Sequence, residues 1–187
     1  MQSSIAAGIA IAAALFAFEA RADVVESDAH SASIRIVVPL GVSPGKAYDA
    51  FVQPAKWWDG EHTYSGDAAR LQLNPTAGGC FCELLPDGGS VLHMTVVHVV
   101  PKQRITLSGG LGPLQTAGVA GAMNIAFSAK DAGAELVLVY NLGGYYPKGL
   151  DSVAPLVDQV LRHQMERLKQ FAETGKVERA PQKPSTP

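Results

Sequence analysis

Two cysteines and one histidine form the sharpest candidate for chemistry in the sequence. Cys80 and Cys82 stand two residues apart in a segment that reads as a strand, and His93 lies in the next such segment. Two thiolates and an imidazole can bind zinc, but no fourth ligand is evident. A cysteine nucleophile activated by His93 needs an orienting group and an oxyanion hole, and neither is recognisable. We therefore expect no metal and no cofactor.

The interpretation we favour for the two cysteines is structural. Buried thiols behave as small hydrophobic side chains, and burial would shield them from oxidation. A disulfide between Cys80 and Cys82 is disfavoured on a regular strand, where Cα atoms two residues apart are separated by about 6.5–7 Å. The oxidation state of the pair stays open at this point.

Aromatic side chains crowd one short segment of the chain, which holds Trp57, Trp58, His62 and Tyr64. Such rings could stack on a flat apolar ligand at the mouth of a cavity. The alternative is that the tryptophans close one end of the hydrophobic core. The sequence does not decide between the two.

The elements that must position these residues are predicted in the order strand, two short helices, six strands and a long helix. The first strand covers residues 33–38, Ser43 caps a helix that begins at Pro44, and a second helical turn covers residues 54–58. Turn residues separate the next strands, which is typical of an antiparallel meander. These six strands are expected at residues 68–73, 79–85, 90–100, 104–108, 122–129 and 135–141.

The last predicted element is a long helix over residues 152–174 with one apolar face. That face carries Val153, Leu156, Val157, Val160, Leu161, Leu168 and Phe171. Gln164 lies in the middle of this apolar stripe, and a buried amide without a partner costs a few kcal/mol. We therefore expect Gln164 to meet a polar strand residue, water or a ligand.

This order of elements resembles the START-like, or SRPBCC, superfamily with its helix-grip fold. The resemblance covers residues 32–174 and is carried by residues 42–44, 57–58, 78–83, 100–101 and 111–113. The branch that the chain resembles holds polyketide cyclase/dehydrase-like proteins and homologues of the heat-shock-chaperone ATPase activator. The resemblance implies an α+β fold, in which a seven-stranded antiparallel curved sheet wraps around the long C-terminal helix. It also implies a cavity between sheet and helix that commonly holds an apolar small molecule.

Turn positions predict which side chains face this cavity. The turn at residues 86–89 pairs Cys80 with Thr95 and Cys82 with His93. The turn at residues 101–103 pairs Val97 with Leu107, and the turn at residues 130–133 pairs Met123 with Tyr140, Ile125 with Leu138 and Phe127 with Leu136. We expect all these side chains to point inward. One β-bulge between the predicted strands at residues 79–85 and 90–100 would reverse which side chains face inward. It would expose the cysteines and turn Phe81 and Glu83 inside.

Our first hypothesis is a protein that encloses a small, mostly apolar ligand, either lipid-like or aromatic. The candidate ligand-binding residues are Trp58, Tyr64, Cys80, Cys82, His93, Thr95, Met123, Phe127, Leu138, Tyr140 and Gln164. The alternative is an enzyme similar to polyketide cyclases or aromatases, with His93 as general base and Tyr140 as acid or oxyanion donor. A third hypothesis, a chaperone ATPase activator, depends on the resemblance alone.

The N-terminus predicts export. Residues 5–18 are apolar, and Ala20 and Ala22 fit the small-residue rule for cleavage before Asp23. About 14 apolar residues are too few for a membrane span, which needs roughly 20. We expect residues 1–22 to be a cleaved signal peptide, and the mature protein to be periplasmic or secreted without stable membrane insertion. Export argues against a cytosolic chaperone partner.

The remaining chain is expected to form one domain at residues 23–175. Residues 176–187 carry three prolines without apolar periodicity and read as a disordered tail. Fifteen Lys and Arg against 17 Asp and Glu give a net charge of −2 for the 187 residues. Without a basic excess to neutralise phosphates, we expect no nucleic-acid partner. The oligomeric state stays open.

Overall fold

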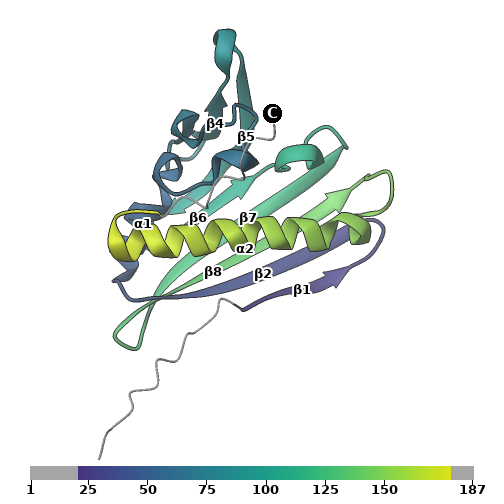
Figure 1. The fold of residues 1–187 in the computed structure, drawn as a ribbon. Coiled ribbons are helices and arrows are strands. Elements are labelled where there is room, and N and C mark those ends of the chain that lie inside the picture. Colours follow the sequence, from purple (N-terminus) through teal and green to yellow (C-terminus); the bar gives the residue numbers. More distant parts are fainter. Residues whose placement is uncertain (1–20, 178–187) are drawn as a thin grey trace, which may run out of the picture.

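An antiparallel sheet and a long helix laid across it dominate the computed structural model, which describes residues 21–177 (Figure 1). The strands are β1 (Arg21–Ser27), β2 (Ser31–Leu40), β3 (Leu71–Leu73), β4 (Cys80–Leu84), β5 (Ser90–Val100), β6 (Arg104–Ser108), β7 (Val119–Lys130) and β8 (Gly133–Gly144). The α-helices are α1 (Pro44–Phe51) and α2 (Leu150–Thr174). Short 3₁₀ turns are η1 (Pro54–Lys56), η2 (Gly60–His62), η3 (Ala68–Arg70), η4 (Pro86–Gly88) and η5 (Gly112–Leu114).

The strands form a single curved sheet in the order β1-β2-β8-β7-β6-β5-β4-β3. The helix α2 packs against β1, β2, β8 and α1. The core lies between this helix and the inner face of the sheet, where Ile34, Ile125 and Leu136 are fully buried. The predicted α+β class, with an antiparallel curved sheet and a long C-terminal helix, is confirmed.

The sheet has one strand more than predicted. Residues 21–27 form β1, which pairs antiparallel with β2 and makes the eighth strand. The prediction missed it because this segment shows no clean alternation of apolar and polar residues. The predicted signal peptide lies outside the described residues except for Arg21 and Ala22, which begin β1. Most of the predicted tail, from residue 178, also lies outside them.

The helices begin and end at the capping residues that the sequence indicates. The Ser43 hydroxyl accepts a hydrogen bond from Lys46 N, and Pro44 is the first residue of α1. The helix α2 ends at Gly175, whose φ of 76° gives the left-handed cap that glycine adopts readily. Among residues 21–177, no helix combines the length and apolar character of a membrane-spanning segment.

The predicted register of β7 and β8 is confirmed, because Met123, Ile125 and Phe127 lie opposite Tyr140, Leu138 and Leu136. The register of β5 is interrupted twice. One shift lies between Val96 and His98, and it leaves Val97 unpaired and 51% exposed instead of inward. The other lies opposite the Phe81–Cys82 step, where Cys82 pairs with Leu92 and His93 has no partner in the ladder.

These two bulges explain which inward predictions fail. Between them, Met94 and Val96 are buried, so Thr95 alternates onto the outer face. The second bulge then returns His93 to the inside, where it is 7% exposed. On β4, Phe81 and Glu83 are buried and the two cysteines lie on the opposite face, which is the arrangement expected from a β-bulge.

The cysteines form a disulfide, so the expectation of shielded free thiols is wrong. The Cα atoms of Cys80 and Cys82 are 5.4 Å apart at this irregular point of the ladder, closer than on a regular strand and within disulfide range. A disulfide-bonded cysteine offers neither a thiolate nucleophile nor a zinc ligand. Both of those readings of Cys80, Cys82 and His93 are therefore excluded for this state of the protein.

Thiol labelling tests the disulfide directly. Protein purified without reductant and denatured in the presence of a maleimide should take up no label, because there is no free thiol. After reduction it should take up one label on each cysteine. Intact mass spectrometry provides the measurement, and Cys82→Ser should label without reduction. Labelling of the unreduced wild-type chain would contradict the disulfide.

Candidate functional site

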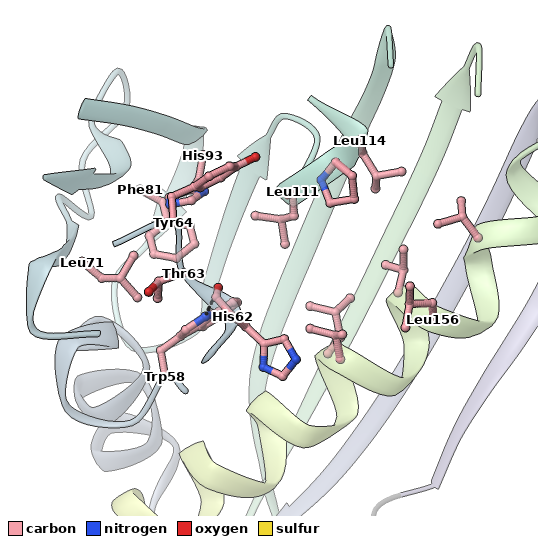
Figure 2. A pocket seen from close by; sticks show the side chains of 16 residues that line it. Trp58, His62, Thr63, Tyr64, Leu71, Phe81, His93, Leu111, Leu114 and Leu156 are labelled. Atoms are coloured by element: carbon pink, nitrogen blue, oxygen red, sulfur yellow. Dashed lines mark hydrogen bonds between the residues drawn. The ribbon is translucent and has the colours of Figure 1, made fainter. Parts of the chain in front are cut away.

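A cavity of about 360 Å³ opens between α2, the strands β3–β5 and two loops (Figure 2). This volume is at the lower end of the range for small-molecule sites. Most of its wall is apolar and consists of Trp58, Leu71, Phe81, Leu111, Pro113, Leu114, Val153, Leu156, Val157, Val160 and Leu161.

The helix supplies one side of the cavity. Val153, Leu156, Val157, Val160 and Leu161 recur at helical spacing and therefore share one face of α2. Leu156 is 56% exposed, so it lies where the cavity meets solvent. The predicted apolar stripe thus divides along the helix: its N-terminal half borders the cavity, whereas Leu168 further along is buried in the core.

The opposite side carries a buried pair of polar groups. His93 lies at the cavity wall, and its Nε2 is 2.9 Å from Oε2 of Glu83, which is fully buried. Backbone N–H groups donate to the same carboxylate, from Ser65 to Oε1 at 2.5 Å and from Tyr64 to Oε2 at 3.2 Å. A buried carboxylate with three donors is satisfied without water.

These contacts set the protonation of both groups. Burial alone would raise the pKa of Glu83, but hydrogen bonds from Ser65, Tyr64 and His93 hold it below its ordinary value. Burial lowers the pKa of His93, and Glu83 offsets this only in part. At neutral pH the pair is therefore a carboxylate and a neutral imidazole. Because the carboxylate can only accept, Nε2 of His93 carries the proton.

Two aromatic rings pack against the imidazole of His93. The ring of Tyr64 stacks on His93 with centroids 5.9 Å apart, and the Phe81 ring lies 5.0 Å away. Figure 2 shows the three side chains together on the strand side of the cavity, away from α2. Tyr64 is 53% exposed and so borders both the cavity and solvent.

The loop of residues 57–65 is fastened to α2 by the buried Gln164. Its Oε1 accepts from Asp59 N at 2.9 Å, and its Nε2 lies 3.0 Å from Nδ1 of His62. Arg167 adds a hydrogen bond to the carbonyl of Trp57 at 2.9 Å. Gln164 is therefore buried and partnered as expected, but its partners come from a loop and not from a strand.

Asp59, His62 and His163 are the one group in residues 21–177 whose donor atoms could hold a metal ion, lying within 4.8 Å of one another. Two imidazoles and a carboxylate suit zinc or another first-row cation. Here the atoms are already engaged: His163 Nε2 is 2.7 Å from Asp59 Oδ2, and Gln164 directs an N–H at His62 Nδ1. Burial alone would raise the pKa of Asp59, but hydrogen bonds from His163 and Glu61 N–H lower it. These hydrogen bonds join the 57–65 loop to α2.

Tyr140 is not at the cavity. It is fully buried, donates to Gly109 O at 2.9 Å and accepts from Leu111 N at 3.1 Å. Burial raises the pKa of Tyr140 to about 12. Both hydrogen-bonding functions of the hydroxyl serve the backbone that precedes η5, so the predicted role as acid or oxyanion donor is not supported by this placement.

The structure brings together three of the predicted ligand-binding residues, Trp58, Tyr64 and His93, at the cavity. Met123 and Leu138 border a second, apolar hollow of about 30 Å³ in the core instead. Phe127 packs against Tyr48 and Phe51. Cys80, Cys82 and Thr95 lie on the outer face of the sheet. The side chain of Gln164 is hydrogen-bonded to Asp59 N and His62, and the hydroxyl of Tyr140 is hydrogen-bonded to backbone groups.

Glu83, which is buried behind the cavity wall and bonded to His93, is absent from the candidate residues of the sequence analysis. Its only signal was the β-bulge alternative, which turns Glu83 inward together with Phe81. His163, to which the sequence analysis gave no role, is half-buried and paired with Asp59. Glu83 and His163 contact residues that are distant in sequence, so no local sequence pattern predicts these contacts.

Comparisons with known proteins concern the fold. No family model and no curated protein matches the chain. A solved structure of an uncharacterized protein from Rhizobium leguminosarum is 20% identical, covers 82% of this chain and 97% of its own, and gives a TM-score of 0.57. A protein from Chromobacterium violaceum is 21% identical over 75% of this chain and 96% of its own, with a TM-score of 0.54.

CalU16 from Micromonospora echinospora is similar as well, with 15% identity, 83% coverage of each chain and a TM-score of 0.51. At these identities the similarity establishes a shared arrangement of sheet and C-terminal helix. The chemistry of the cavity must be inferred from its own residues.

Tyr140→Phe tests the structural role of the buried hydroxyl. The change leaves the carbonyl of Gly109 and the N–H of Leu111 unpaired, which should lower the free energy of unfolding by about 1–3 kcal/mol. Urea unfolding gives the value. Tyr145→Phe, at a side chain 69% exposed, is the matched control and should change stability by less than about 0.5 kcal/mol. Equal stability of both variants would contradict the assignment.

Acidification should destabilise the protein through His93. Its pKa is lowered in the folded state, so the unfolded chain binds a proton first as the pH falls below about 6.5. The free energy of unfolding should therefore decrease from there toward and through the folded pKa. Urea unfolding at about pH 7.5 and pH 5.5 measures the loss. His93→Gln should reduce it, whereas His98→Gln, at an exposed histidine of β5, should leave it unchanged.

Proposed function

We propose that the protein binds a small hydrophobic molecule in the cavity beside α2. The observation that carries this proposal is a space of about 360 Å³ with an apolar wall and a single buried polar pair at one side. Apolar walls supply burial energy, while a few placed polar groups orient a ligand. An ordinary core would fill such a space, because unfilled volume costs stability.

The fold supports the SRPBCC assignment that accompanies this proposal. An antiparallel curved sheet, a long C-terminal helix and a cavity between them are the arrangement that the resemblance implies. We therefore propose that the chain is a helix-grip protein of the START-like type.

We also propose that the protein is exported. The apolar N-terminal segment and its cleavage pattern indicate a signal peptide, and the disulfide between Cys80 and Cys82 adds an independent argument. Disulfides persist in oxidising compartments such as the bacterial periplasm and are rare in the cytosol. Cleavage before Asp23 would leave residues 23–27 of β1 in the sheet.

The second candidate function is catalysis, and the Glu83–His93 pair is the observation that favours it. A buried carboxylate that orients a neutral imidazole is suited to general-base work. The acid expected to complement it, Tyr140, lies outside the cavity, and both cysteines are oxidised. Binding is therefore the function that the site supports best. His93→Ala should weaken a carrier and abolish turnover by an enzyme.

Filling the cavity tests the proposal. Val160 lines it from α2, and Val160→Trp should occupy the space and weaken binding of an apolar fluorescent probe such as 1-aminoanthracene at least about tenfold. Val97→Trp, the same change at an exposed position of β5, should bind the probe like wild type. Fluorescence titration gives both dissociation constants.

Two results would overturn the cavity as the binding site: absence of probe binding to wild type, or equal affinity in both tryptophan variants. Native mass spectrometry of the freshly purified protein provides a second measurement, because a bound lipid or aromatic molecule adds its mass to the folded chain.

A further inference from the structure

We propose that the ligand is a neutral, largely apolar molecule with one hydroxyl group, and that Nδ1 of His93 accepts the hydrogen bond from that hydroxyl. In this proposal Glu83 is the positioning residue that makes His93 an acceptor. The inference depends on the proposed binding function and names the chemical class that the cavity selects.

The first step is the charge on Glu83. Its two oxygens receive hydrogen bonds from the backbone N–H groups of Ser65 and Tyr64. Backbone N–H groups can only donate, so the carboxylate facing them acts as an acceptor at both oxygens. Neither N–H can turn away, because each belongs to the loop that Gln164 and Arg167 fasten to α2.

The second step is the tautomer of His93. Since Oε2 of Glu83 is an acceptor, the ring nitrogen 2.9 Å away must donate, and the proton of a neutral imidazole is on Nε2. The other nitrogen, Nδ1, then carries a lone pair. Burial favours the neutral ring, which keeps that lone pair free.

The third step is the accessibility of Nδ1. Within residues 21–177 no hydrogen bond involves Nδ1 of His93. In the same residues, Oδ1 of Asp158 is the only side-chain N or O atom that is both inaccessible and without a partner. Since Nδ1 has no partner and is not such an atom, it must be accessible. His93 lines the cavity and is otherwise buried, so the accessible Nδ1 is taken to face this space. The hydroxyl of Thr63 donates to Gly60 O, and Nδ1 of His62 receives an N–H from Gln164. The hydroxyl oxygens of Thr63 and Tyr64 also border the cavity, but the lone pair of a neutral imidazole is more basic than that of a hydroxyl, so Nδ1 of His93 is the strongest acceptor offered to a ligand.

The fourth step concerns charge. No lysine or arginine is among the residues that line the cavity, and the charge bonded directly to the imidazole of His93 is the negative one on Glu83. A ligand carboxylate would be desolvated without a counter-ion and would face a like charge. Ionised fatty acids and aromatic acids are thus disfavoured relative to alcohols and phenols of the same size.

Three naphthalenes of similar size separate these predictions. 1-Naphthol donates a hydrogen bond, 1-methoxynaphthalene cannot donate, and 1-naphthoate is an anion at neutral pH. A cavity that selects by hydrophobicity alone prefers the methyl ether. We expect the opposite order, with 1-naphthol bound about tenfold more tightly than 1-methoxynaphthalene and 1-naphthoate weakest. Displacement of 1-aminoanthracene at neutral pH, checked by calorimetry, measures the three dissociation constants.

Two variants assign the preference to the pair. In Glu83→Gln the amide oxygen should keep the shorter of the two backbone bonds, the one from Ser65, so that its N–H faces Nε2 of His93. The imidazole proton then moves to Nδ1, and the naphthol preference should fall to about twofold or less because the ether can now accept. His93→Leu removes the acceptor, keeps an apolar wall and should make the ether the tighter ligand. His98→Leu, the same change at an exposed site on β5, should retain the wild-type ratio. Circular dichroism confirms that each variant is folded.

The outcomes are distinguishable. If 1-aminoanthracene does not bind wild-type protein, the proposed binding function fails and this inference fails with it. If the probe binds but none of the three compounds displaces it, the binding function stands and this inference is overturned. If they bind in the order of their hydrophobicity, the binding function stands and the role of the hydroxyl is overturned. A naphthol preference that survives His93→Leu would also overturn it. If Glu83→Gln does not fold, His93→Leu and the wild-type order still decide.

Discussion

One buried carboxylate organises the candidate site. Glu83 lies behind an apolar wall, and its burial is tolerated because Ser65, Tyr64 and His93 all donate to it. The same three hydrogen bonds place the 57–65 loop against β4, fix the imidazole by its Nε2 and leave the other nitrogen toward the cavity. A loop, two strands and the polarity of the cavity thus depend on one ionised group, whose loss would leave backbone donors buried without partners.

Much of the fold could be predicted from the sequence. Strands β5 and β6 begin and end where their turn residues predict, and the β7–β8 register follows from the turn that joins them. The apolar stripe of α2 anticipates the helix side of the cavity, because helical spacing is a local property. Fold class and the helix side of the cavity wall are accordingly readable from short-range patterns.

The site itself could be predicted only in part. His93 is inward as expected, yet for a different reason: one bulge at Val97 reverses the alternation of β5, and a second at His93 restores it. A bulge adds one residue to one strand and leaves no consistent mark in apolar periodicity. The disulfide and the inward direction of Glu83 both follow from that irregularity. The inward Glu83 was open to pattern reasoning only as the β-bulge alternative, and the disulfide was disfavoured. The pairing of Gln164 with a distant loop is likewise a tertiary contact.

Both rims of the cavity are held by hydrogen bonds before any ligand arrives. On one side Gln164 and Arg167 secure the 57–65 loop, and on the other the Tyr140 hydroxyl secures the backbone at Leu111. The conformational entropy of these loops is lost during folding and not during association. Complex formation should therefore show the calorimetric signature of a rigid host, in which the heat-capacity change reports desolvation of apolar surface without a contribution from loop ordering.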